Sequence, residues 1–449
     1  MTTYSLRQQA ALTVLLFGML LLLVPRAGHG GDVHYWYTWA CYIFDYGLGN
    51  VYQVPDNNYN PLYHYILWAF GKLAGSKERI DHYRHWLKAF TLVFDFAGAF
   101  WAASLVGERE RRFGLVLVLL FNIGYLYNTL IWEQVDAIYT FFAFGAVVLA
   151  VQQRSVASLL CFVLALAAKT QAIIFLPPLL LLWAPQWWRR PSRLLLGGVG
   201  SAALLALLLA PFIWFGYDNY VPRIVAINLG ATEVYPVVFM GAFNFWCLLP
   251  THLSLDLSDA TVVAGLSYRG WGLGLFCGSS ALALLPLLLA TARQLRAGPR
   301  AAVAPFPTPL PPPALPATDL APDLALTLLS CGLIPLLFCF FNTQMHERYW
   351  HAAILFLAAY AFLRRDYLPY GLASAAYFLN LEGVLRYLNL LKYTSFFLRP
   401  WFSAALFALT IIICLVKLYR LATLRAARQG RQLGAAPKSA ESSSWPVPA

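Results

Sequence analysis

The stretch LLLGGVGSAALLALLLAPFIWF, residues 194–215, decides the class of fold because it contains no charged side chain. A helix needs about 20 apolar residues to cross the hydrocarbon layer of a bilayer. Hydrophobic residues make up 60% of the 449-residue chain and charged residues only 12%, which is about half the charged share of a soluble domain. A soluble fold and a disordered chain are therefore excluded, and an all-α polytopic membrane protein is predicted.

Similar apolar runs recur along the chain, and their number predicts about 12 transmembrane helices. The predicted spans are 9–25, 86–106, 113–130, 135–151, 156–168, 171–185, 194–215, 271–292, 324–341, 351–363, 367–385 and 400–417. The first run is interpreted as an uncleaved span, and a cleaved signal peptide is the alternative. Two amphipathic segments, 36–44 and 61–73, are predicted to lie on the membrane surface as helices. Pro61 suits the first turn of the second one, where its missing N–H removes no hydrogen bond.

The chain divides into four predicted parts. Residues 1–298 form an N-terminal transmembrane module that includes the long outer loop 26–85, and residues 323–418 hold the remaining helices. Between them, residues 299–322 include PFPTPLPPP and form a proline-rich cytoplasmic linker of the polyproline type. Residues 419–449 are a basic cytoplasmic tail, which we expect to be disordered.

The net charge of +12 comes largely from basic clusters beside apolar runs, at 109–112, 189–193, 293–300 and 417–438. Cytoplasmic loops of membrane proteins carry such clusters. The pattern favours a cytoplasmic location for both termini, and it argues against nucleic-acid binding because no basic stripe is interleaved with aromatic residues. The seven cysteines show neither disulfide nor metal-binding spacing.

Four polar clusters fall at the same, outer ends of the predicted spans. They are GD at 31–32, WEQVD at 132–136, KTQ at 169–171 and QMHERY at 344–349. Ionisable side chains at membrane depth are costly and usually face a cavity or one another. A snorkelling charge or a helix cap would explain any single cluster, but four on one face predict a polar cavity that opens outward.

Three side chains in these clusters suit a phosphate. Arg348 donates two parallel hydrogen bonds, His346 supplies one donor with a titratable charge, and Lys169 is a point charge. The alternative for Arg348 is an ion pair with Glu347 that locks two helices together.

Asp32 has two interpretations. It is either the N-cap of a helix that begins at His34 or a general base, and spacing alone favours the cap.

These residues, taken in order, resemble the GT-C superfamily of membrane glycosyltransferases, which use polyprenyl-phosphate-linked sugars. The sequence is most similar to bacterial integral-membrane mannosyl- or glucosyltransferases, and more distantly to the dolichyl-phosphate-glucose glucosyltransferases of the ER. The resemblance rests on GD at 31–32, NYNPLY at 58–63, WEQVD at 132–136, KTQA at 169–172, AFNFW at 242–246 and MHERY at 345–349, across about 320 residues.

The resemblance implies an inverting transfer by direct displacement at the anomeric carbon, with Asp32 as the catalytic base. It implies that His346, Arg348 and Lys169 bind the donor phosphate. It places a further set beside the sugar or the acceptor: Tyr59, Asn60, Glu133, Gln134, Asp136, Gln171, Asn244 and Glu347. Relatives often carry Gly at the position of Glu133 and Pro at that of Asn60, which leaves the sugar undecided. No metal ligands are predicted, and a divalent cation, Mg²⁺ or Mn²⁺, stays open because only some members need one.

The implied partners are a polyprenyl-phosphate sugar donor, a lipid-linked or glycan acceptor, and membrane lipids. We expect a multi-pass protein of the bacterial inner membrane rather than the ER, with its site on the periplasmic or lumenal side. A transporter or a flippase for lipid-linked sugars is the alternative function, and a noncatalytic scaffold is a third. A transporter predicts charges in the inner half of the spans, where the sequence has few.

Overall fold

The computed structural model describes residues 4–24, 28–230, 235–249, 257–296 and 323–434. Its α-helices are α1 (Leu6–Leu23), α2 (Gly30–Tyr46), α3 (Pro61–Ala74), α4 (Lys77–Tyr83), α5 (Lys88–Ser104), α6 (Arg109–Leu120), α7 (Ile123–Leu126), α8 (Asp136–Val151), α9 (Ser155–Ala168), α10 (Leu176–Arg189), α11 (Pro191–Trp214), α12 (Val221–Leu229), α13 (Tyr268–Arg296), α14 (Leu324–Phe341), α15 (His351–Arg364), α16 (Leu368–Leu385) and α17 (Pro400–Gly434). Short 3-10 or π turns join them: η1 (Leu48–Gln53), η2 (Arg84–Leu87), η3 (Tyr127–Ile131), η4 (Thr170–Phe175), η5 (Phe245–Leu248) and η6 (Leu390–Lys392). The strands β1 (Val262–Val263) and β2 (Leu266–Ser267) pair antiparallel in a small hairpin.

The all-helical class is confirmed, but the count of 12 spans is not. Within the described residues, six helices are long and apolar enough to cross a membrane: Leu6–Leu23, Lys77–Ser104, Pro191–Trp214, Tyr268–Arg296, Leu324–Phe341 and Pro400–Arg425. The bent pair α6 and α7–η3 would make a seventh. Among the other predicted spans, α8, α9 and α15 are apolar but have only 14 to 16 residues. At 1.5 Å per residue they reach about 21–24 Å, short of the ~30 Å hydrocarbon layer.

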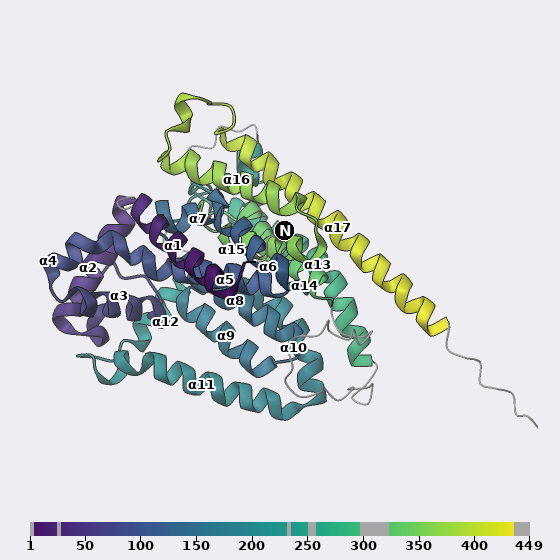
Figure 1. The fold of residues 1–449 in the computed structure, drawn as a ribbon, viewed down its shortest axis with the longest axis horizontal. Helices are drawn as coiled ribbons and strands as arrows, with labels where there is room; N and C mark the ends of the chain where they lie inside the picture. Colours follow the sequence, from purple (N-terminus) through teal and green to yellow (C-terminus); the bar gives the residue numbers. More distant parts are fainter. Residues whose placement is uncertain (1–3, 25–27, 231–234, 250–256, 297–322, 435–449) are drawn as a thin grey trace, which may run out of the picture.

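The apolar helices fall into two groups by their burial. In α14, 83% of the most apolar 18-residue stretch is buried inside the protein, and α15 packs against this helix. In α1 and α11 the corresponding shares are only 11% and 6%, and Figure 1 shows α11 along the edge of the molecule. A helix that is apolar on all sides and has so little protein around it needs a hydrocarbon surrounding. The fold is therefore that of a membrane-embedded protein.

The predicted span 113–130 is not one straight helix, because the chain breaks at residues 121–122 and bends by 60°; its two halves together are apolar enough for one bent span. Asn122 explains the break. Its Oδ1 accepts the backbone N–H of Tyr125 at 3.2 Å and so caps α7. Its amide nitrogen donates to the hydroxyls of Tyr370 at 2.6 Å and Ser374 at 2.7 Å, both on α16. The polar side chain therefore ends one helix, starts another and ties the bend to a neighbouring helix.

Two predictions concern the C-terminal half. The helix α17 continues to Gly434, so the expectation of a disordered tail is wrong for residues 419–434. This segment is rich in Leu, Ala and Arg, which favour helix. The proline-rich linker 299–322 and the end of the tail, 435–449, lie outside the described residues.

The helices α2, α3 and α4 group together at one end of the molecule (Figure 1). Here α2 covers the predicted segment 36–44 and α3 covers 61–73, with Pro61 at its first position as expected. The buried side chains of α2, including Trp36, Trp39 and Ile43, recur at helical spacing and pack toward α3. This packing fixes the direction of the first turn of α2, which carries Asp32.

Candidate functional site

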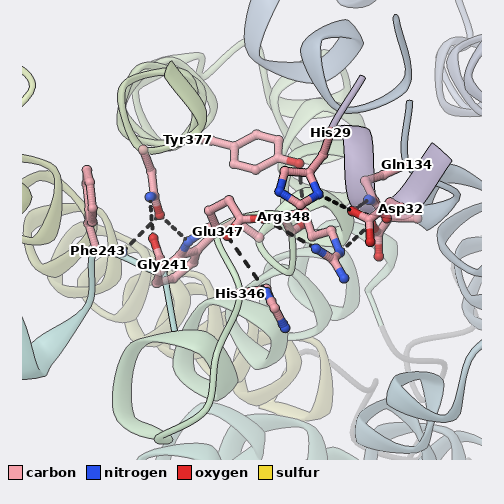
Figure 2. A network of polar contacts seen from close by, with 12 residues as sticks. His29, Asp32, Gln134, Gly241, Phe243, His346, Glu347, Arg348 and Tyr377 are labelled. Carbon is pink, nitrogen blue, oxygen red and sulfur yellow. Dashed lines mark hydrogen bonds and ion pairs between the residues drawn. The ribbon is translucent and has the colours of Figure 1, made fainter. Parts of the chain in front are cut away.

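Asp32 lies in the first turn of α2 and does not cap it. The helix begins at Gly30, four residues before the predicted start at His34, and the cap position belongs to His29. The capping interpretation of Asp32 is therefore wrong. Instead, Asp32 Oδ2 accepts a hydrogen bond from Gln134 Nε2 at 2.6 Å and lies 3.4 Å from His29 Nδ1. Figure 2 shows His29 and Gln134 gathered around this carboxylate.

The surroundings of Asp32 keep it ionised. Burial disfavours the charged form, but the hydrogen bond from His29 and the positive charge of Arg348 outweigh it and lower the pKa of Asp32 below 3.8. The same hydrogen bond raises the pKa of His29 above 6.5, despite partial burial. At neutral pH the carboxylate is therefore free to accept a proton, which a general base requires.

Arg348 lies in the connection between α14 and α15, and its guanidinium points toward Asp32 (Figure 2). Its own partners are distant: Nη1 is 3.4 Å from Glu347 Oε1, and Nε is 4.0 Å from Asp136 Oδ2. Nε is buried without a hydrogen-bond partner. A buried guanidinium with an unused N–H is unfavourable unless an anion accepts it. This arrangement suits an incoming phosphate.

Lys169 follows the end of α9 and is already paired. Its Nζ donates to Asp136 Oδ1 at the start of α8 and lies 4.8 Å from the ring centre of Tyr349. Burial lowers the pKa of Lys169, and the charge of Asp136 offsets part of this effect. The structure therefore brings Lys169 beside Arg348, but its charge is compensated more fully than that of Arg348.

His346 and Glu347 complete the same connection. His346 Nδ1 lies 3.9 Å from Glu347 Oε2, and burial, followed by the charge of Arg348, lowers the pKa of His346. The ring is therefore neutral at pH 7 and offers one N–H donor. Glu347 packs over Gly241, which has φ +95°. A Cβ at that position would lie 2.5 Å from Glu347 Oε2, so only glycine leaves room for this carboxylate.

Tyr59 also belongs to this group. It packs between Trp39 and Tyr63 with ring centres 5.3 Å and 5.6 Å away. Burial raises its pKa, and the charges of Arg348 and Asp32 also act on it. Gln171 lies in η4, where its side-chain oxygen is buried without a hydrogen-bond partner.

Two predicted sugar-binding amides are instead occupied by structural hydrogen bonds. Asn60 donates to Leu166 O at 2.8 Å and accepts from Asn228 Nδ2 at 2.9 Å. Asn244 donates to Cys339 O at 3.1 Å and to Asn342 O at 3.2 Å, and its oxygen accepts the Trp246 N–H. These amides hold neighbouring segments together.

Glu133 also differs from its predicted place. It forms ion pairs with Lys88 at 2.8 Å and His85 at 3.0 Å, while the next residue, Gln134, faces Asp32. Glu133 has a positive φ of 62°, which turns it away from its neighbour. Its pairing with Lys88 could not be predicted from sequence, because 45 residues separate the two.

Sequence reasoning missed two further groups. Tyr377 donates to Arg348 O at 3.3 Å and so fixes the backbone that carries the guanidinium. Asp95 Oδ1 and His351 Nε2 lie 3.5 Å apart with both side chains fully buried. Asp95 could have been found, because a single carboxylate inside the apolar run 86–106 is a signal for function by itself.

A divalent cation needs several oxygen ligands that are free to coordinate it. Within the part of the chain that the structure describes, no three His, Cys, Asp or Glu side chains gather as metal ligands. Asp136 and Glu347 face Lys169 and Arg348 instead. These residues therefore do not fit Mg²⁺ or Mn²⁺.

The fold and the site define a helical membrane protein in which Asp32 on α2, Lys169 after α9 and Arg348 before α15 each contact the start of α8, through Gln134 or Asp136. No protein-family model matches this chain, and no curated protein matches it.

Proposed function

We propose that this chain is a membrane-embedded inverting glycosyltransferase of the GT-C type. It would move a hexose from a polyprenyl-phosphate donor to a hydroxyl of a lipid-linked or glycan acceptor. One observation carries the proposal: the segment that begins α8 contacts both a carboxylate and a guanidinium. Gln134 donates to Asp32 at 2.6 Å, and Asp136 Oδ2 lies 4.0 Å from Nε of Arg348, a buried guanidinium with an unused N–H. Displacement of a phosphate from a sugar needs a base at the attacking oxygen and positive charge at the leaving oxygen.

The step follows from these two groups. The acceptor hydroxyl attacks the anomeric carbon from the face opposite the phosphate, and a new C–O bond forms there. The bond from that carbon to the phosphate oxygen breaks, and its electron pair leaves with the phosphate, which becomes a monoester dianion. The acceptor proton passes to Asp32, and exchange with water then restores the carboxylate, whose side chain is 25% exposed. Attack from the opposite face inverts the configuration.

Each remaining residue has a defined part in this proposal. Arg348 donates to the departing phosphate oxygens, and the neutral His346 adds one hydrogen bond. The Asp136–Lys169 pair keeps positive charge beside Arg348 without leaving it uncompensated in a buried place. Apolar helices with little protein around them, such as α11, are compatible with a donor that carries an isoprenoid chain.

The membrane arrangement is part of the proposal. We place 12 spans in the bilayer, with the short helices α8, α9 and α15 inside the bundle and α2 and α3 on the membrane surface. The basic clusters support cytoplasmic termini. The site then faces the periplasm or the lumen, with a bacterial inner membrane as the expected location.

The substitution Asp32→Asn tests the chemistry. Asn has nearly the same size and still offers an oxygen to Gln134, so the fold should persist, but an amide cannot take the acceptor proton. Turnover of a synthetic polyprenyl-phosphate hexose should fall by about 10²–10⁴-fold, with an unchanged thermal unfolding temperature. Asp45→Asn is the matched control, because Asp45 lies on the same helix and pairs with Lys77 at 2.9 Å. Wild-type turnover by Asp32→Asn would remove Asp32 from the reaction.

A flippase or transporter for lipid-linked sugars is the second candidate, and the buried Asp95–His351 pair favours it. Ionisable residues inside a bundle often mark a transport path. In this case purified protein in liposomes would move a fluorescent lipid-phosphate sugar between leaflets with its glycosidic bond intact. Asp95→Asn would stop this movement, whereas Asp32→Asn would leave it unchanged.

A further inference from the structure

A cavity of about 370 Å³ lies at the same end of the molecule as the candidate site. Its polar and aromatic lining comes from three separate segments: Tyr35 on α2, Asp56 and Asn58 in the loop before α3, and Arg223 on α12, with Tyr235 beyond it. The volume is within the range of about 300–1,000 Å³ that is usual for small-molecule sites.

Three connections place this cavity beside the reacting groups. The ring of Tyr235 meets the edge of His346, with ring centres 5.6 Å apart. Tyr35 follows Asp32 by three residues on α2, so both lie on one side of the helix. Asn58 directly precedes Tyr59, which packs on Trp39 near Asp32 and Arg348. A ligand in the cavity would therefore extend toward Asp32.

The lining has the chemistry that binds carbohydrates. Tyr35 is 43% exposed and Tyr235 45% exposed, so each offers a ring on which the C–H face of a sugar can pack. Asp56 and Asn58 are exposed, and their side chains form no hydrogen bond within the described residues. A carboxylate and an amide with free hydrogen-bonding capacity suit vicinal hydroxyls.

Arg223 has a different part in the cavity. Its Nη2 donates to Val54 O at 3.0 Å and Pro55 O at 2.9 Å, which fixes the backbone that carries Asp56. The polar groups are thus held in place before a ligand arrives, which lowers the entropic cost of binding.

A second cavity, of about 320 Å³, provides the contrast. It lies between α3, α5 and α8 and is lined almost entirely by apolar groups, among them Leu62, Phe90 and Phe142. It offers no set of donors and acceptors to a hydroxylated ligand. Of the two cavities, only the polar one suits a sugar.

We infer that the cavity lined by Tyr35, Asp56, Asn58 and Tyr235 binds a carbohydrate portion of the acceptor. The acceptor is then a glycan or glycolipid, and its reacting hydroxyl is presented to Asp32 from this side. That the bound carbohydrate is the acceptor rests on the proposed function. Carbohydrate binding itself can be measured without any transfer.

The experiment uses full-length protein in a zwitterionic detergent that contains no sugar. The probes are the octyl glycosides of glucose, mannose and galactose, each below its micellar concentration, and octane-1,2-diol is the non-sugar control. Saturation-transfer NMR detects contact with sugar protons, and titration gives Kd. The test variants are the double substitution Asp56→Ala/Asn58→Ala and the single substitution Tyr235→Ala. Asp218→Ala and Tyr217→Ala are matched controls, because both residues are exposed in the segment before α12.

At least one glycoside should bind more tightly than the diol. In the double variant the Kd of this glycoside should rise by about 50-fold, the product of about 5-fold for the lost hydrogen bond to the amide and about 10-fold for the lost hydrogen bond to the carboxylate. The two control variants should bind like the wild type. The inference is overturned if no glycoside binds better than the diol, or if the cavity variants bind as the wild type does.

The outcomes separate the two proposals. If Asp32→Asn stops transfer while the cavity variants keep the wild-type KM for the acceptor, the inference fails and the proposed function stands. If Asp32→Asn keeps full turnover while the cavity variants lose glycoside binding, the proposed function fails and the carbohydrate site stands.

Discussion

Removal of the Arg348 guanidinium should distinguish a structural ion pair from a phosphate site. Arg348 Nη1 lies 3.4 Å from Glu347 Oε1, and the two side chains are 12% and 3% exposed. The substitution Arg348→Met alone leaves Glu347 as a buried carboxylate whose remaining ionisable neighbour, the neutral ring of His346, is 3.9 Å away. Breaking a buried pair from one side costs about 3–5 kcal/mol in the free energy of unfolding.

The double substitution Arg348→Met/Glu347→Gln removes both charges and should restore most of that stability, because uncharged groups of similar volume replace a buried pair at little cost. The affinity for a lipid phosphate should stay low in both variants. The phosphate has lost a charge-assisted donor worth about 1.5–3 kcal/mol, which corresponds to roughly 10- to 150-fold in Kd.

Thermal unfolding of the purified variants measures the first effect, and titration with farnesyl phosphate, followed by tryptophan fluorescence, measures the second. The exposed pair Arg365–Glu108, 2.5 Å apart, supplies the control, since Arg365→Met/Glu108→Gln should change neither quantity by much. If the double variant at 347 and 348 recovers stability together with wild-type affinity for farnesyl phosphate, Arg348 is structural and the reasoning is refuted.

Two more predictions concern charges around the same region. Asp32→Asn should lower the pKa of His29 toward 6.5, because the hydrogen bond to Asp32 raises this pKa in the wild type. In the wild type, protonated His29 therefore stabilises the fold below pH 6.5, and this stabilisation is lost as the pH rises through the higher pKa of the folded state. NMR titration of the His29 ring measures the shift, and an unchanged pKa would contradict the contact. Lys88→Met should lower the free energy of unfolding by about 3–5 kcal/mol, because Glu133 loses its partner at 2.8 Å. The double substitution Lys88→Met/Glu133→Gln should recover most of this stability in thermal unfolding, and no recovery would contradict the pairing.

The sequence predicted the helices well because hydropathy is a property of each segment alone. Helices occur at all of the predicted intervals, and α14 matches its predicted bounds, 324–341. The bend at Asn122 could not be predicted, since it depends on Tyr370 and Ser374 about 250 residues away. The number of spans stays a prediction for a related reason: composition marks short apolar helices such as α9 as spans, although their length alone does not cross a bilayer.

The site was predicted in part. The alternation of predicted spans placed Asp32, Asp136, Lys169 and Arg348 at one face, and contacts link Lys169 and Arg348 to Asp136. The hydrogen-bond partners of the side-chain amides could not be predicted from the alternation of spans. The orientation of Asn244, for example, follows from carbonyl groups at the end of α14, and nothing in its own segment reveals them.

Two residues beside the candidate site hold an unfavourable backbone conformation. Glu133 and Gln344 have φ values of 62° and 64°, a conformation that costs a non-glycine residue about 1–3 kcal/mol and persists only where neighbouring contacts enforce it. Those contacts are present. Glu133 is fixed by Lys88 at 2.8 Å, and Gln344 donates to Asp259 at 2.7 Å. Each unfavourable residue directly precedes a segment that reaches the site, Gln134 in one case and the His346–Arg348 turn in the other. Because a partner from a distant segment enforces each φ, the orientation of the adjoining site residues depends on Lys88 in one case and on Asp259 in the other.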